Sequence, residues 1–260
     1  MANRIESEDN NKLKLVRKLQ IRKHRDAEAK FIIEGINLVE EAISKNADID
    51  YIIISDDFDY DPTRLKLSDL SEVYEVRREI FERLADAENG SGVLAVVSKP
   101  KFSDEDLDRL ANDANVLVLD RVQDPGNIGT MIRTAVAAGY SMVVCNKGTV
   151  DVWSPKVLRA TAGMIFDIPV IYLEGTDELV RLLRRLDKRI CVTVLEDAYA
   201  YYERDLSKGI ALVIGNEGNG ISDELIEMAD ERLTIPMKGN IESLNAAVSA
   251  AILMYEAIRR

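Results

Sequence analysis

The feature that most constrains the fold is a regular alternation in the C-terminal part of the chain. Short unbroken apolar runs, such as Val116–Leu119, Met142–Cys145 and Ile210–Ile214, are separated by segments with helical spacing. Strands that are buried on both faces of a parallel sheet have this composition, because helices cover both faces. We therefore expect an α/β domain with a parallel sheet covered by helices. Its further strands are expected at 170–172, 190–195 and 233–235, and its helices at 128–138, 156–162, 177–186, 223–228 and 243–258.

A polar, proline-bearing segment at 98–104 separates this part from a smaller N-terminal α/β unit. A chain of 260 residues suits one large domain or two small ones, and we predict two, at 1–99 and 100–260. Ser103, followed by Glu105 and Asp106, is a typical start of a helix. The N-terminal unit is expected to contain one amphipathic helix at 8–27, strands at 31–33, 51–54 and 93–97, and helices from Gly35 and at 79–87.

The distribution of charge separates one segment from the rest of the chain. The whole sequence has 34 basic and 46 acidic residues, which argues against nonspecific nucleic-acid binding. Residues 10–25 nevertheless contain seven basic residues and no acidic one. This segment is either a solvated helix face or an arm that contacts phosphates, and charge alone does not decide between them. The seven are Lys12, Lys14, Arg17, Lys18, Arg22, Lys23 and Arg25.

Residue usage excludes several classes of protein. Cys145 and Cys191 lie in apolar runs, so we expect small core residues in a reducing cytoplasm rather than a disulfide framework or a zinc site. The single histidine, His24, disfavours metal sites built from several histidines and a Ser-His-Asp mechanism. No apolar run approaches the roughly 18 residues of a membrane span, and the first residues lack the apolar region of a signal peptide. We expect neither a membrane nor a metal partner.

Three polar loops, each of which follows a strand and precedes a helix, are candidates for a ligand site. They span 120–129, 215–222 and 236–245. Ligands of parallel sheets bind beyond the carboxyl ends of the strands, where these loops would meet. Gly215, Gly218 and Gly220 could instead serve only a turn. They form neither a P-loop nor the G-x-G-x-x-G pattern of dinucleotide-binding proteins.

The loops carry a resemblance to a known family. Asp124-Pro125-Gly126-Asn127-Ile128-Gly129 with Arg133 resembles the first motif of the SpoU-type (TrmH-like) RNA ribose 2′-O-methyltransferases of the SPOUT superfamily. Gly215-Asn216-Glu217-Gly218-Asn219-Gly220 resembles their second motif, and Ile235-Pro236-Met237 through Ser243-Leu244-Asn245 their third. Residues 155–163 also resemble a family segment. The likeness covers about 115–260, with Thr161, Ala162 and Ala246 as mild departures. The N-terminal part resembles, less specifically, the substrate-binding domain of the same family.

The resemblance implies a fold and a reaction. The C-terminal sheet would have five or six parallel strands with a deep trefoil knot, and the N-terminal domain would be of the L30e-like type. The protein would bind S-adenosylmethionine in the knot and methylate a ribose 2′-hydroxyl of structured RNA, with 23S rRNA favoured over tRNA. It would act as a homodimer, which agrees with a last helix that is apolar on more than one face.

The resemblance also assigns residues. Gly215, Ile235 and Leu244 would contact the cofactor through backbone groups, although Ile235 and Leu244 could also be core residues. Arg133 would stabilise the alkoxide of the attacking hydroxyl and orient phosphate, with action as a base left open. Asn127, Glu217, Ser243 and Asn245 would complete the catalytic site, while Asn127 and Ser243 alternatively cap helices. The residues expected to contact RNA are Lys14, Arg17, Lys18, Arg22, Lys23, Arg25, Lys156 and Arg159.

Two other functions stay open at this stage. A protein of the same fold could bind RNA or assist ribosome assembly without catalysis, although Arg133, Asn127, Glu217 and Asn245 would then have less use. A methyltransferase of similar fold could instead act on a base.

Overall fold

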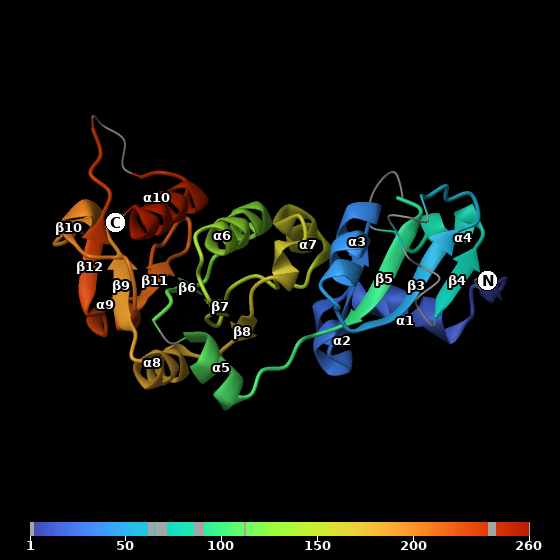
Figure 1. Ribbon diagram of the computed structural model, residues 1–260, viewed down its shortest axis with the longest axis horizontal. Helices are drawn as coiled ribbons and strands as arrows, with labels where there is room; N and C mark the ends of the chain where they lie inside the picture. Colours follow the sequence, from blue (N-terminus) through green and yellow to red (C-terminus); the bar gives the residue numbers. More distant parts are fainter. Residues whose placement is uncertain are drawn as a thin grey trace. The chain divides into compact units, whose positions relative to one another are not determined.

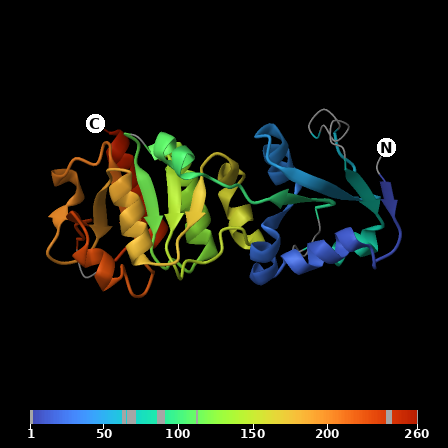
Figure 2. The same ribbon diagram turned by 90° about the horizontal axis from the view of Figure 1, so that it is seen from below.

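The computed structural model of the chain divides into two compact units (Figures 1 and 2). It describes residues 3–61, 65, 72–85, 91–111, 113–238 and 243–259. Unit 1 consists of Met1–Lys101 and Asp151–Phe166, and unit 2 of Phe102–Val150 and Asp167–Arg260. The first division lies close to the predicted boundary. The sequence placed 151–166 in the C-terminal domain, whereas the structure places this segment in unit 1.

Unit 2 is built on a parallel sheet, as expected. Within the described residues its strand order is β10-β12-β9-β11-β6-β7-β8, and each neighbouring pair is parallel. The two-residue edge strand β10 was not predicted, since it is too short to show a pattern. The strands are β6 (Val116–Leu119), β7 (Met142–Cys145), β8 (Val170–Tyr172), β9 (Arg189–Thr193), β10 (Tyr199–Ala200), β11 (Ile210–Ile214) and β12 (Glu231–Thr234).

Helices cover both faces of this sheet. Leu179 and Leu183 of α8 (Thr176–Arg185) pack with Val116 and Val118 in one buried cluster. The same cluster includes Leu107 of α5 (Asp104–Ala111) and Leu225 of α9 (Asp223–Glu227). On the opposite face, α6 (Pro125–Ala137) packs against α10 (Ala246–Ile258) (Figure 1). The fully buried strands therefore carry apolar side chains on both faces.

Capping residues set the starts of the two helices that carry site residues. The Asp124 carboxylate accepts from the backbone N–H of Asn127 at 2.7 Å, and Pro125 takes the first helical position. Asn245 Oδ1 accepts from the N–H groups of Ala247 and Val248 at 2.9 and 3.3 Å, so α10 begins at 246. The cap of α10 is thus Asn245, and not Ser243.

Unit 1 contains a mixed sheet of order β1-β4-β3-β5-β2 among the described residues. Strand β5 is antiparallel to both β2 and β3, while β4 is parallel to β1 and β3. The sequence did not predict the short edge strand β1 or the half-buried β4. The elements are β1 (Asn3–Ile5), β2 (Lys30–Glu34), α3 (Ile36–Ser44), β3 (Ile49–Ser55), β4 (Val73–Val76), α4 (Arg78–Glu82) and β5 (Val93–Ser98).

The predicted single helix at 8–27 is wrong. The chain forms α1 (Asn11–Leu19) and α2 (Arg22–Glu28), with Ile21 in an extended conformation between them. The Arg25 guanidinium donates to the carbonyl oxygens of Leu19 and Gln20 at 2.7 and 2.8 Å. These carbonyls end α1, so a side chain from the next helix satisfies groups that a continuous helix would have bonded internally.

Residues 151–166 pack on the rest of unit 1 through aromatic rings and a close turn. The Trp153 ring lies 4.6 Å from that of Phe31, centroid to centroid, and Phe166 lies 6.4 Å from the same ring. The helix α7 (Pro155–Thr161) packs on β2. Gly163 has a φ of +91°, and a Cβ there would lie 2.7 Å from Glu41 Cγ. Only glycine suits this turn.

Two further expectations concern the interior. Cys145 and Cys191 are buried in β7 and β9, which confirms their role as core residues. Within the described ranges, every helix is too short or too polar to cross a bilayer. The trefoil knot stays a prediction of the resemblance.

Candidate functional site

The site is built where the loops after β6, β11 and β12 meet. Because all three strands run parallel in one sheet, their carboxyl ends lie at the same edge. The loop after β6 leads into α6, the loop after β11 into α9, and the segment after β12 into α10. The predicted convergence of these loops is therefore present, apart from residues 239–242, which lie outside the described residues.

A chain of hydrogen bonds joins the three loops through their side chains. The Glu217 carboxylate accepts from Asn127 Nδ2 at 3.0 Å and from the backbone N–H groups of Gln123 and Asp124, both at 3.1 Å. Asn127 Oδ1 in turn accepts from Asn245 Nδ2 at 2.9 Å. Each side chain therefore bonds to a partner from a different loop. We define Glu217, Asn127 and Asn245 as the polar relay.

The relay favours the charged form of Glu217. Partial burial raises the pKa of its carboxyl group, but the hydrogen bonds from Asn127, Gln123 and Asp124 outweigh burial and leave the pKa below its ordinary value. The carboxylate makes no ion pair with an arginine in the described part of the chain. Its three donors are an amide and two backbone N–H groups.

The loop after β11 is a tight turn whose geometry requires glycine at its first position. Asn216 and Gly220 exchange two backbone hydrogen bonds of 2.9 Å, and Asn216 Oδ1 accepts from the N–H groups of Gly218 and Asn219. A Cβ at Gly215 would lie 2.3 Å from the Gly220 carbonyl carbon. Backbone atoms cannot move aside as a flexible side chain can, so a larger residue at 215 would open the turn.

Asp120 supports the loops from beneath, a role that sequence reasoning missed. Its side chain is fully buried at the end of β6, where it accepts from Asn146 Nδ2 and from the Ser222 N–H, both at 2.8 Å. It joins the ends of β6 and β7 to the start of α9. An aspartate directly after a buried apolar strand was the available signal, since a buried carboxylate needs partners.

A pocket of about 550 Å³ lies over the ends of β9, β11 and β12. Gly215, Ile235 and Leu244, the three residues predicted to contact a cofactor, all line it. Ser243, Asn245 and Glu217 line it as well. The wall formed by Thr193, Val194 and Leu195 after β9 was not predicted. The pocket size suits a small organic ligand, because such sites commonly measure roughly 300–1,000 Å³.

Arg133 lies on α6, six positions after Asn127 in the sequence. Its side chain is exposed, and it makes no hydrogen bond or ion pair with any described residue. It is not among the residues that line the pocket. The helix α6 packs against α10, whose N-cap Asn245 does line the pocket. The guanidinium is thus a free cation on a helix that the polar relay ties to the pocket.

The residues predicted to contact RNA divide into three groups. Lys18, Lys23, Lys156 and Arg159 are exposed. Lys14, Arg17 and Arg22 form surface ion pairs with Asp9, Glu8 and Asp26. The prediction for Arg25 is wrong, because this side chain is buried and paired with Asp151 at 2.7 Å. The partners of Lys14, Arg17 and Arg22 flank the basic segment in the sequence, whereas the partner of Arg25 lies more than a hundred positions away.

Among the described residues, no group of three or more His, Cys, Asp or Glu side chains could hold a metal ion.

Comparison with known proteins gives the family. The SpoU rRNA Methylase family matches residues 114–255, and the MRM3-like substrate binding domain matches residues 10–95. The 23S rRNA (guanosine(2553)-2′-O)-methyltransferase RlmP of Bacillus subtilis (strain 168) is 38% identical over 254 residues, which cover 96% of this chain and 97% of the relative.

Solved structures give the same result. An AdoMet-bound rRNA methyltransferase from Sinorhizobium meliloti superposes with a TM-score of 0.87 at 30% identity, covering 99% of this chain and 98% of the other. The SpoU methyltransferase AviRb from Streptomyces viridochromogenes, solved in complex with AdoMet, gives 0.84 at 26% identity, with 96% and 97% covered.

The Gly215→Ala variant tests the tight turn. We expect its melting temperature to fall by about 2 to 12 °C, because overpacking against backbone costs about 1–3 kcal/mol and each kcal/mol lowers the melting temperature of a chain of this size by about 2–4 °C. Binding of S-adenosylmethionine, measured by calorimetry, should weaken as well. Gly218→Ala is the matched control, since a Cβ there would meet only Asn216 Oδ1 at 3.7 Å. Equal behaviour of the two variants would contradict the proposed constraint.

The Glu217→Gln variant tests the relay through pH. The lowered pKa of Glu217 means that its bonds stabilise the folded protein above the ordinary carboxyl pKa, and that this stabilisation is lost as pH falls through the lowered value. Near neutral pH the natural chain should therefore melt at a higher temperature than Glu217→Gln. This difference in melting temperature should shrink as the pH falls and disappear in acid. Glu227→Gln, at an exposed position of α9, is the control. A difference that does not change with pH would exclude this role.

Proposed function

Because the chain belongs to the SpoU rRNA Methylase family, we propose that it transfers the methyl group of S-adenosylmethionine to a ribose 2′-hydroxyl of structured RNA. The observation that carries this proposal is the pocket lined by Gly215, Ile235 and Leu244, which the polar relay connects to the helix of Arg133. Ribosomal RNA is the preferred substrate class, in agreement with the 23S rRNA methyltransferases among its relatives.

The residues of the pocket fit the methyl donor. Gly215 lines the pocket with backbone atoms, and its lack of a side chain lets the loop close on Gly220. Leu195, Ile235 and Leu244 offer apolar surface, while Thr193 and Ser243 offer hydroxyl groups. Such a mixture suits an adenosine with an amino-acid tail. When bound there, S-adenosylmethionine supplies an electrophilic methyl group on a positively charged sulfur.

Arg133 is the proposed catalytic residue. A ribose hydroxyl is weakly acidic, so the attacking oxygen needs a positive group beside it as negative charge develops. An arginine stays protonated in proteins and offers five N–H donors, which suits an alkoxide or a neighbouring phosphate better than it suits proton abstraction. Since Arg133 has no acidic partner among the described residues, its charge is available to the substrate.

The polar relay has a positioning role in this proposal. Glu217 uses its carboxylate on three donors of the first loop, so it organises that loop and does not act as the base. Asn127 and Asn245 fix the starts of α6 and α10 relative to one another. Ser243 lines the pocket and completes its polar wall.

We propose further that the protein acts in the cytoplasm as a homodimer. Val248, Tyr255 and Ile258 of α10 are each about half exposed. Successive members of this set are seven and three residues apart, so they lie on one side of the helix. They form an apolar stripe that suits contact with a second copy of this chain.

A direct assay tests the reaction. The full chain is incubated with S-adenosylmethionine labelled in its methyl group and with protein-free 23S rRNA or tRNA, after which the RNA is hydrolysed in alkali. We expect the label in alkali-resistant dinucleotides, because a methylated 2′-oxygen cannot attack the next phosphodiester. Label in mononucleotides would instead indicate a base methyltransferase. Failure to bind S-adenosylmethionine in calorimetry would indicate an RNA-binding protein without catalysis.

The Arg133→Ala variant tests the catalytic assignment. We expect kcat to fall at least about 100-fold, since removal of one group that stabilises an oxyanion typically costs about 10²–10³. Affinity for S-adenosylmethionine should stay nearly unchanged, because Arg133 does not line the pocket. Arg181→Ala, at an exposed position of α8, is the matched control and should keep full activity. Activity of Arg133→Ala within a few-fold of the natural chain would refute the assignment.

A further inference from the structure

A buried ion pair in unit 1 joins two segments that are far apart in the sequence. Arg25 Nε donates to Asp151 Oδ2 at 2.8 Å, and Arg25 Nη2 lies 2.7 Å from the same oxygen. Both residues are only 4% exposed. The proposed reaction uses neither of them.

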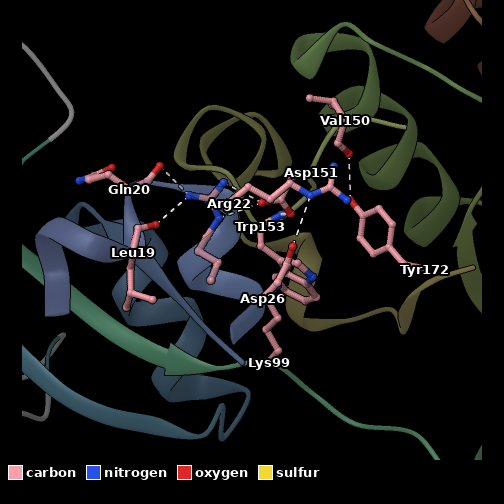
Figure 3. Close-up of polar contacts among 10 residues, drawn as sticks. Leu19, Gln20, Arg22, Asp26, Lys99, Val150, Asp151, Trp153 and Tyr172 are labelled. Atoms are coloured by element: carbon pink, nitrogen blue, oxygen red, sulfur yellow. Dashed lines mark hydrogen bonds and ion pairs between the residues drawn. The ribbon is translucent and has the colours of Figure 1, made fainter. Parts of the chain in front are cut away.

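Both side chains of the pair make further hydrogen bonds. Arg25 Nη1 donates to the carbonyl oxygens of Leu19 and Gln20, while Asp151 Oδ1 accepts from the Trp153 N–H at 3.0 Å. Figure 3 shows Leu19, Gln20, Asp151 and Trp153 gathered at this point. A buried pair of this kind contributes little net stability compared with apolar residues, but loss of one partner leaves a buried charge without compensation. The pair therefore specifies one arrangement of the segments that it joins.

What the pair fixes is the position of residues 151–166. This segment lies inside the match to the SpoU rRNA Methylase family, yet it packs in unit 1. The chain leaves unit 2 after Val150 and returns to it at Asp167. Between these points the Trp153 ring packs against that of Phe31 at an interplanar angle of 35°, and α7 packs on β2. The ion pair adds a directional contact at the point where the segment enters unit 1.

The anchored segment carries exposed positive charge. Lys156 and Arg159 of α7 are exposed, as is Lys23 of α2. Both α2 and α7 pack on β2, so these cations lie on neighbouring elements of one unit. The helix α2 carries two acidic residues, Asp26 and Glu28, of which Asp26 is engaged by Lys99 at 2.6 Å and by Arg22 at 3.6 Å. Phosphate groups are the partner that such exposed cations fit.

We propose that Arg25 and Asp151 are positioning residues for the RNA substrate. Their ion pair holds α7 on unit 1, so that Lys156 contacts RNA phosphates as part of the same surface as Lys23. The inference rests on the proposed function, because it assumes that structured RNA is the substrate. It assigns to Arg25 an action through α7, in place of the direct phosphate contact that its sequence context predicted.

A double-mutant cycle in the full chain tests this coupling. The variants are Arg25→Gln, Lys156→Gln and both together, and the measurement is affinity for protein-free 23S rRNA at constant salt. In the natural background, Lys156→Gln should weaken binding about eightfold at about 0.1 M salt, the contribution of one phosphate contact. In the Arg25→Gln background the same change should have almost no effect, because α7 is no longer held in place. Lys208→Gln, at an exposed position of unit 2, is the control and should give additive effects.

A second variant separates positioning from folding. Asp151→Asn keeps the shape of the side chain, and Arg25 keeps its bonds to Leu19 and Gln20. We expect its KM for RNA to rise while kcat at saturating RNA and affinity for S-adenosylmethionine stay nearly unchanged, since only binding of the RNA is impaired. This variant keeps the cycle measurable if Arg25→Gln does not fold.

Two results would overturn the inference. One is a Lys156→Gln effect of equal size in both backgrounds, and the other is natural RNA affinity in Asp151→Asn. Failure of the proposed function would look different, since the unaltered chain would then not bind S-adenosylmethionine or would not methylate RNA. A chain that methylates RNA but gives additive effects in the cycle contradicts only the positioning role.

Discussion

The site depends on one carboxylate that gathers three separate loops. Glu217 accepts from the first loop at three donors, and through Asn127 it reaches Asn245, which starts the last helix. Without contacts between them, the loops would not be fixed relative to one another, because their backbone N–H groups could bond to water equally well. The relay removes this freedom. Beneath it, the fully buried Asp120 ties the ends of the strands to the start of α9.

An acidic chain that acts on RNA has to separate its charges. The net charge of −12 opposes RNA at long range. In unit 1 acidic side chains neutralise Lys14, Arg17 and Arg22, while Arg25 is buried against Asp151. Lys23 of α2 and Lys156 of α7 lie exposed on their helices. Contact with RNA would therefore depend on their geometry more than on total charge, which makes the position of α7 important.

Much of the fold was visible in the sequence, for local reasons. Continuous apolar runs predicted β6, β7, β8, β9, β11 and β12, since strands of a covered parallel sheet have no solvent-facing side. Edge elements were missed, as with β1 and β10, because two or three residues show no periodicity. The helix predicted at 8–27 failed for a different reason. The helix is interrupted at Ile21, and the Arg25 side chain donates to the carbonyl oxygens of Leu19 and Gln20 at the end of α1. Periodicity in the sequence does not show that a side chain will bond to these carbonyls.

By itself the sequence determined the family, the parallel sheet and two of the segments that line the pocket, those after β11 and β12, because each of these is written in short contiguous patterns. Tertiary structure alone decided that Arg25 is buried and to which unit residues 151–166 belong. Arg25 and Asp151 are separated by more than a hundred positions, so no local pattern predicts that they meet. A side chain in a basic helix can face phosphate or the core, and packing settles which, since only the folded chain supplies a buried partner.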